Sequence, residues 1–210
     1  MPFSTVALDQ ALDALNGGSP TSIIAYAALF SAYSATGTAN ELTGGSPAYA
    51  RQAVTWSAAS GGSKSDASVA GAFNVPAGST VAFVGLFPGL TATTNFAGMG
   101  PNDAGTQYAF TATAASPCVF TAPGSSYSNG NTVVLFPGAG GTLPTGPGFT
   151  AGTIYYVVSA SGATFELSAT SGGSAINASA VGSGIVQSLT LELFGAQGTY
   201  TLSSETLSLA

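Results

Sequence analysis

The fold class is clearest in residues 69–87, which read VAGAFNVPAGSTVAFVGLF. At every second position, Val69, Gly71, Phe73 and Val75 would share one face of a strand, and Val81, Phe83 and Phe87 would share one face of the next. Alternation of this kind over a few residues indicates a half-buried β-strand. Pro76-Ala77-Gly78 supplies turn residues between the two runs. The stretch therefore predicts two antiparallel strands joined by a turn.

The same signature extends along most of the chain. After Pro20, strand-like segments are separated by turns of Gly, Pro, Ser and Asn every eight to twelve residues, a spacing typical of all-β domains. Residues 23–33 are largely apolar, which predicts a central strand buried on both faces. We therefore expect an all-β chain built on an antiparallel β-sandwich-like domain. Further alternating segments predict strands at Val54 and Trp56, at Phe165 and Leu167, from Leu189 through Leu191 to Leu193, and at Tyr200 and Leu202.

One N-terminal helix is expected, from Thr5 to Leu15. Ser4 or Thr5 can cap its start, and Asn16-Gly17-Gly18 can cap its end. A helix with a single apolar stripe must dock on its own sheet or on a neighbouring subunit. The stripe consists of residues at helical spacing, namely Leu8, Ala11, Leu12 and Leu15.

A second small β module is expected at residues 117–186, inserted into the first domain. Short strands and Gly/Pro turns are dense there, for example in residues 137–141 and 144–148. The first domain would then comprise residues 1–116 and 187–210.

Composition removes several classes of function. The 210 residues include eight acidic and two basic side chains, no histidine and one cysteine, with a net charge of −6. A Ser-His-Asp relay or a histidine metal site is therefore excluded, and two basic residues cannot neutralise a nucleic-acid backbone. We expect no enzyme activity, no cofactor, no metal and no nucleic-acid partner.

Membrane insertion and export are not expected either. The longest apolar run, residues 23–30, is far shorter than the ~20 residues of a membrane span. No basic segment precedes an apolar run at the N-terminus, so we expect no secretory signal and synthesis in a reducing cytoplasm. Cys118 is the single cysteine, so no intrachain disulfide can form. Sparse charge fits two alternatives: a surface buried between subunits, or a domain hydrated by hydroxyls and backbone.

Two groups of acidic residues could in principle support catalysis or calcium binding, but each has a plainer structural interpretation. Glu166 and Glu192 could form a glycosidase acid and base pair, but both lie on polar strand faces that we expect to be solvated. Residues 100–105 offer oxygens to Ca²⁺ with one carboxylate, and we expect a turn there. Catalytic, cofactor and metal residues are therefore predicted to be absent.

Arg51, the only arginine, is the most informative polar residue. It follows a glycine-rich turn, with Tyr49 beside it and Glu41 nearby in sequence. Arginine forms bidentate pairs with carboxylates or binds backbone carbonyls. We expect Glu41, Tyr49 and Arg51 to form a structural clamp rather than a ligand contact.

Three aromatic residues have two possible roles. Trp56, Tyr155 and Tyr156 could form a sugar-stacking platform, as in a secreted carbohydrate-binding module. Aromatic residues on strands usually belong to the core. We expect Trp56 in the core and one of the two tyrosines facing outward.

The segment around Arg51 resembles a family of tailed-bacteriophage virion proteins, labelled tail-fibre or minor tail proteins. Residues 44–56, GGSPAYARQAVTW, followed by AASGG at 58–62, are similar to its G-x-x-Y-A-R-Q-A-V-T-F core. The LDQALDAL segment at 8–15, YAALF at 26–30, VGLF at 84–87 and FAGMG at 96–100 match other family segments in order. Pro88 stands where the family has an acidic residue.

The second module carries its own resemblance, to a β module that recurs in phage tail and coat proteins. Its matching segments are LPTG at 143–146, FTAGTIYYVV at 149–158 and ATFELS at 163–168. FGAQGTYTL at 194–202 would then return to close the first domain.

Together the two resemblances imply a non-enzymatic structural protein of the virion. The first expectation is a homo-oligomeric tail-fibre or minor tail component that binds other virion proteins and contacts the host surface. A capsid decoration or head-fibre protein is the alternative, and a secreted carbohydrate-binding module is a third hypothesis.

Overall fold

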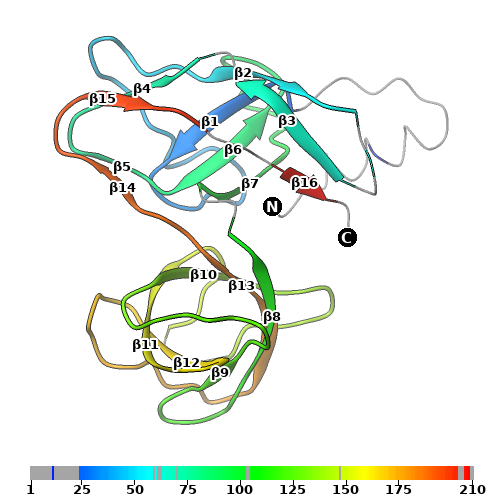
Figure 1. Cartoon of the computed structure of the whole chain (residues 1–210), viewed down its shortest axis with the longest axis vertical. Coiled ribbons are helices and arrows are strands. Elements are labelled where there is room, and N and C mark those ends of the chain that lie inside the picture. The colour runs from blue at the N-terminus through cyan, green and yellow to red at the C-terminus, as the bar shows by residue number, and fades with distance from the viewer. Residues whose placement is uncertain are drawn as a thin grey trace. The chain divides into compact units, whose positions relative to one another are not determined.

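The computed structural model describes residues 11, 24–58, 60, 63–69, 71–102, 105–146, 148–202 and 206–208. Within them the regular secondary structure is nearly all β, in antiparallel sheets, which confirms the all-β part of the expected fold class (Figure 1). Of the expected helix from Thr5 to Leu15, only Ala11 is described, so this prediction lies outside the described residues. In the described part of the chain no helix is long and apolar enough to cross a membrane.

The chain divides into two compact units. Unit 1 comprises Met1–Ala104 and Leu191–Ala210, and unit 2 comprises Gly105–Thr190. Unit 2 begins earlier and ends later than the module expected at residues 117–186. The bounds differ because strand β8 (Gln107–Ala112) pairs along its whole length with β13 (Gly182–Ser188) and so belongs to unit 2.

Unit 1 contains one six-stranded sheet and two two-stranded sheets. The large sheet has the order β16-β3-β2-β1-β6-β7, and the small sheets pair β14 with β5 and β15 with β4. Every pairing is antiparallel. The strands are β1 (Tyr26–Phe30), β2 (Gln52–Trp56), β3 (Ser63–Val69), β4 (Phe73–Val75), β5 (Ser79–Val81), β6 (Phe83–Phe87), β7 (Gly98–Pro101), β14 (Glu192–Phe194), β15 (Gly198–Tyr200) and β16 (Thr206–Ser208).

Strand β1 is the central strand expected from the apolar run at 23–33, although it is shorter. It pairs with β6 over all five residues and with β2 on its other side, and every residue after Tyr26 is buried. A strand with a neighbour on both sides and buried side chains on both faces explains an apolar run without alternation. The core of unit 1 forms around it, with Leu29, Phe73, Val84 and Leu86.

The two long strands predicted in residues 69–87 are each divided. The first ends as β3 at Val69 and resumes as β4, and the second breaks at Ala82 between β5 and β6, which belong to different sheets. Ala82 donates its N–H to the Phe30 carbonyl, next to the start of β6. The Pro76–Gly78 turn is present, with the Ser79 N–H donating to the Pro76 carbonyl and Gly78 at a φ of 73°.

Strands β4 and β5 pair with the C-terminal segment rather than with each other. Phe73 lies opposite Tyr200, and Val81 lies opposite Glu192, so residues 73–81 and 192–200 run antiparallel in one register. We call residues 191–202 the strap.

The predicted strand from Leu189 to Leu193 is wrong. Leu189 is buried in unit 2, whereas Leu193 lies in β14 of unit 1 and is 74% exposed.

Unit 2 is a closed six-stranded barrel. The strand order is β10-β11-β12-β9-β8-β13, so each strand has a neighbour on both sides. Side chains fill the interior of a small barrel, and here Phe110, Phe120, Tyr155 and Phe165 do so. Besides β8 and β13, the strands are β9 (Phe120–Thr121), β10 (Thr132–Phe136), β11 (Ile154–Ser161) and β12 (Thr164–Ser168).

Candidate functional site

The residues predicted to form a clamp lie at the neck of a loop on one edge of β1. The Leu42 N–H donates to the Leu29 carbonyl, and Ala27 pairs with Gln52 in β2, so residues 41–42 and β2 follow the same edge. Between these two contacts the chain leaves the edge as residues 43–50, which we call the neck loop. A surface loop with adjacent ends is an Ω-type loop.

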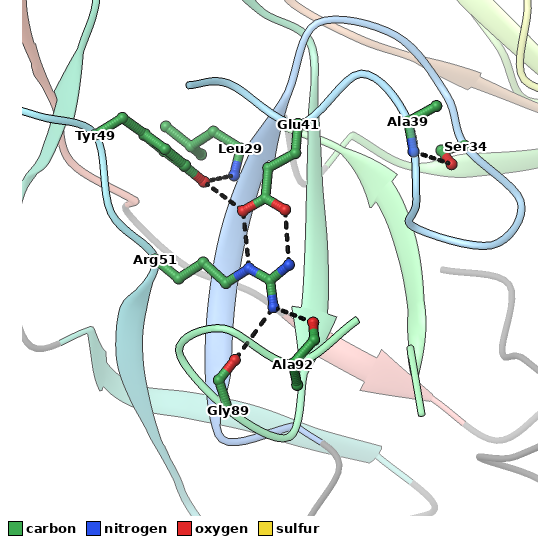
Figure 2. Close-up of polar contacts among 8 residues, drawn as sticks. All are labelled: Leu29, Ser34, Ala39, Glu41, Tyr49, Arg51, Gly89 and Ala92. Atoms are coloured by element: carbon green, nitrogen blue, oxygen red, sulfur yellow. Dashed lines mark hydrogen bonds and ion pairs between the residues drawn. The ribbon is translucent and has the colours of Figure 1, made fainter. Parts of the chain in front are cut away.

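Tyr49 fills the gap that the neck loop leaves in the ladder. The Leu29 N–H donates to the Tyr49 hydroxyl over 2.8 Å, and the hydroxyl donates to Glu41 Oε1 over 3.4 Å (Figure 2). A buried backbone N–H without a partner would destabilise the sheet. Burial of the Tyr49 side chain raises its pKa, so the phenol stays protonated and can keep donating.

Arg51 closes the neck with a bidentate ion pair. Its Nε donates to Glu41 Oε1 over 2.8 Å, and its Nη2 donates to Glu41 Oε2 over 2.7 Å. The side chains of Arg51 and Glu41 are 8% and 21% exposed, so water screens this pair only weakly. The two ends of the neck loop are therefore held together by the strongest type of side-chain hydrogen bond.

The same guanidinium reaches across β1 to the segment that follows its neighbour β6. Its Nη1 donates to the carbonyls of Gly89, over 3.1 Å, and Ala92, over 2.7 Å, in the segment that follows β6 (Figure 2). Its carbon Cζ lies 3.5 Å from the centroid of the Phe87 ring, a cation–π contact. Arg51 therefore joins the start of β2 to the end of β6, with all three guanidinium nitrogens used within the chain.

The structure thus brings Glu41, Tyr49 and Arg51 together. Sequence reasoning did not identify the backbone partners, because a carbonyl such as that of Gly89 or Ala92 has no signature in the amino-acid sequence. It also did not identify Phe87 as the ring beneath Arg51.

The outer end of the neck loop is held by a residue that sequence reasoning missed, Gln197 of the strap. Its Oε1 accepts from the Ser46 N–H, and its Nε2 donates to the Pro47 carbonyl, both over 2.7 Å. The Tyr49 ring stacks on Phe73 at a centroid distance of 6.3 Å. A contact across about 150 residues leaves no local sequence pattern.

The other aromatic candidates lie in separate units. Trp56 in unit 1 is partly buried against the core and donates from Nε1 to the Ile24 carbonyl over 2.6 Å. Tyr155 is buried inside the barrel, and its neighbour Tyr156 is partly exposed, as expected for adjacent residues on one strand. The Trp56 side chain thus packs against the core of unit 1, and the Tyr155 side chain belongs to the core of the barrel.

The carboxylates considered for catalysis are likewise in different units. Glu166 lies on β12 of the barrel and is half-buried, whereas Glu192 lies on β14 of unit 1 and is exposed. Asp103 of the considered calcium segment lies outside the described residues. In the described ranges, His, Cys, Asp and Glu form no group of three that could hold a metal ion.

Comparisons with known proteins give no further guide to function. No protein-family model, curated protein or solved structure matches the chain.

Replacing Gln197 by alanine is expected to lower the free energy of unfolding of unit 1 by about 1–2 kcal/mol, since two hydrogen bonds to the neck loop are lost. Gln197→Glu keeps the acceptor for Ser46 but places a carboxylate oxygen against the Pro47 carbonyl, so it should not recover the stability lost in Gln197→Ala. Urea unfolding followed by Trp56 fluorescence measures the effect. Thr199→Ala, at an exposed strap position, is the control and should change stability by less than about 0.5 kcal/mol. An equal effect of Gln197→Ala and Thr199→Ala would contradict the assignment.

The chain is also expected to lose stability in alkali, because two buried groups of the barrel resist ionisation. Burial, followed by the charge of Glu166, raises the pKa of Cys118 to about 11, and burial raises the pKa of Tyr127 to about 12. In the unfolded chain the pKa of the cysteine is about 8.5 and that of the tyrosine is about 10. The unfolded state therefore loses its protons first, so stability is full below about pH 8.5 and falls as the pH rises toward 12.

Urea titrations between pH 7 and pH 12, followed by circular dichroism, measure this loss. The Tyr127→Phe variant removes one ionising group and should lose less stability over the same interval. Identical pH dependence in the variant and the parent chain would show that Tyr127 is not involved.

Proposed function

We propose that this chain is a non-enzymatic structural subunit of a tailed-phage particle, specifically a tail-associated fibre or minor tail component. The support is the ordered resemblance around residues 44–56 together with the contacts that those residues make. In this proposal unit 1 is a β-sandwich-like domain whose N-terminal helix docks on the tail. The barrel faces outward, where it can contact the host surface.

The observation that carries the proposal is that the polar side chains of the motif form hydrogen bonds within the chain. Tyr49 and Arg51, the chemically distinctive residues of the Y-A-R segment, bind Leu29, Glu41, Gly89 and Ala92 within the chain. A motif whose hydrogen-bonding groups all serve to hold a loop and a sheet together is a scaffold motif. It favours a structural protein over an enzyme or a ligand-binding module.

The partners we propose are other virion proteins and further copies of this chain. Charge depletion is a property of surfaces buried between subunits. Glu166 is the only Asp, Glu, Lys or Arg between residues 105 and 190, so barrels can approach one another with little electrostatic repulsion. Repeated copies in a particle assembled from cytoplasmically made chains fit this composition.

Immunogold labelling of intact particles with antibody to this chain tests the location. We expect gold on the tail, with none on particles treated with antibody that has been absorbed on the purified chain. Gold on the head would instead support the alternative, a capsid decoration or head-fibre protein. Particles without gold at either place would overturn the proposal of a virion protein.

A further inference from the structure

Unit 1 is completed by a segment that reaches it only through the barrel. Residues 24–102 of the described chain supply β1 to β7, and the strap supplies β14 and β15 after the chain has passed through unit 2. Strap strand β14 pairs with β5, and β15 pairs with β4. Strand β16, which follows the strap, pairs with β3. The part of the chain after unit 2 therefore supplies three strands of unit 1, two of them from the strap.

The strap makes a full set of contacts with the first segment of unit 1. The Gly78 N–H donates to the Phe194 carbonyl over 2.7 Å, Gln197 holds the neck loop, and the Tyr200 hydroxyl donates to the Asn102 carbonyl over 3.3 Å. Tyr200 packs beside Phe73, and Leu202 is 5% exposed in the core. The strap therefore combines backbone pairing, the side-chain hydrogen bonds of Gln197 and buried side chains, as a strand bound at a specific site does.

A short connection separates the strap from the barrel. The last anchor in the barrel is Leu189, whose N–H donates to the Thr132 carbonyl and whose carbonyl accepts from the Thr132 hydroxyl. The first ladder position of the strap is Glu192, opposite Val81. Thr190 and Leu191 lie between them, at the boundary of the two units. Backbone rotation in residues 190–191 can release the strap while Leu189 keeps its hydrogen bonds to Thr132.

We propose that the strap exchanges between copies of this chain, so that residues 191–202 of one copy pair with β5 and β4 of a second copy, and β16, which follows the strap, pairs with β3 of that same second copy. An exchanged strap makes the same contacts in either arrangement, so exchange costs little contact energy and depends on chain concentration. The inference rests on the proposed many-copy assembly, in which neighbouring chains offer straps at about millimolar effective concentration. The partner is therefore a second copy, and the binding site is the edge that β5 and β4 present.

Two single-cysteine chains test the exchange, both in a Cys118→Ala background. One carries Thr80→Cys in β5, and the other carries Leu193→Cys in β14, at positions directly opposite in the ladder. Thr80 is half-buried and Leu193 is exposed, so both positions tolerate a small side chain. Each chain has one thiol, so a disulfide between the two variants joins two copies, and it forms efficiently when the strap of one copy lies on β5 of the other. The chains are mixed at high concentration and oxidised, and the dimer is identified by mass spectrometry.

A mismatched mixture is the control. Thr80→Cys is mixed with Thr199→Cys, whose strap position lies opposite Asn74 instead. We expect at least about tenfold more linked dimer from the matched mixture, because a disulfide needs Cα atoms within about 7 Å. Equal yields from the two mixtures, or linked dimer from neither, would overturn the proposal.

The chain carrying both Thr80→Cys and Leu193→Cys shows that the variants fold and that the register is correct. At low concentration it should form the disulfide within one chain, which locks the strap in place. The locked chain should then yield less than about a tenth of the dimer that the reduced chain forms when concentrated. A locked chain that assembles as well as the reduced one would count against exchange. These results concern purified protein, so failure here would leave the location on the particle, tested by gold labelling, unaffected.

Discussion

Replacing Arg51 by alanine is expected to lower the free energy of unfolding of unit 1 by about 3–5 kcal/mol, the range for breaking a buried ion pair by removing one partner. Glu41 would keep its charge in a site where only 21% of its side chain is exposed. The carbonyls of Gly89 and Ala92 and the face of the Phe87 ring would lose their partner as well. Trp56 is the only tryptophan and lies in β2, so urea unfolding followed by its fluorescence reports on unit 1 alone.

Two further variants separate charge from geometry at the clamp. Arg51→Lys keeps the charge but cannot form the planar bidentate pair or reach both carbonyls, so most of the loss should remain. The double replacement of Arg51 by Met and Glu41 by Leu removes both charges, and it should cost less than Arg51→Ala alone. A loss of less than about 0.5 kcal/mol in Arg51→Ala would make Arg51 an ordinary surface residue and would contradict the clamp.

Replacing Phe120 by alanine is expected to destabilise the barrel by about 3–5 kcal/mol, as large-to-small changes of buried aromatic residues do. Phe120 is fully buried, stacks on Phe165 at a centroid distance of 5.6 Å, and lies 5.2 Å from the centroids of Phe110 and Phe149. The single cysteine measures the effect, because Cys118 is buried in the barrel core and reacts with a thiol reagent only when the barrel opens.

The matched control for the barrel is Tyr127→Phe. Within the described residues the Tyr127 hydroxyl is buried without a hydrogen-bond partner, so its removal should leave stability equal or slightly higher. We also expect Phe120→Ala to leave the Trp56 transition in place and Arg51→Ala to leave the Cys118 transition in place, as separate cores predict. A shift of both signals in either variant would show that the two units unfold together.

The clamp was foreseeable because its chemistry is local. Glu41 and Arg51 are ten residues apart, and a single arginine in a chain with so little charge has few possible partners. Gln197 was not foreseeable, since a glutamine among strand residues carries no signal that its amide will bind a turn about 150 residues earlier.

The sequence did not predict the boundary between the two units for a related reason. Turn-rich composition indicated a second module, but composition does not show which strands pair. Strand β8 alternates between buried and more exposed residues as β4 of unit 1 does, and only its ladder with β13 places it in the barrel. In the same way, residues 69–87 predicted the Pro76 turn correctly, but the strands on either side of it pair with the strap.

By itself the sequence determined the β class, the central apolar strand and the pairing of Arg51 with Glu41, because each depends on periodicity or on charges close together in the chain. The tertiary structure alone decided the closure of the barrel, the division of the long strands and the contacts of the strap with the neck loop. Strand partners are chosen by long-range packing and hydrogen bonding, and those energies depend on residues that no local window contains.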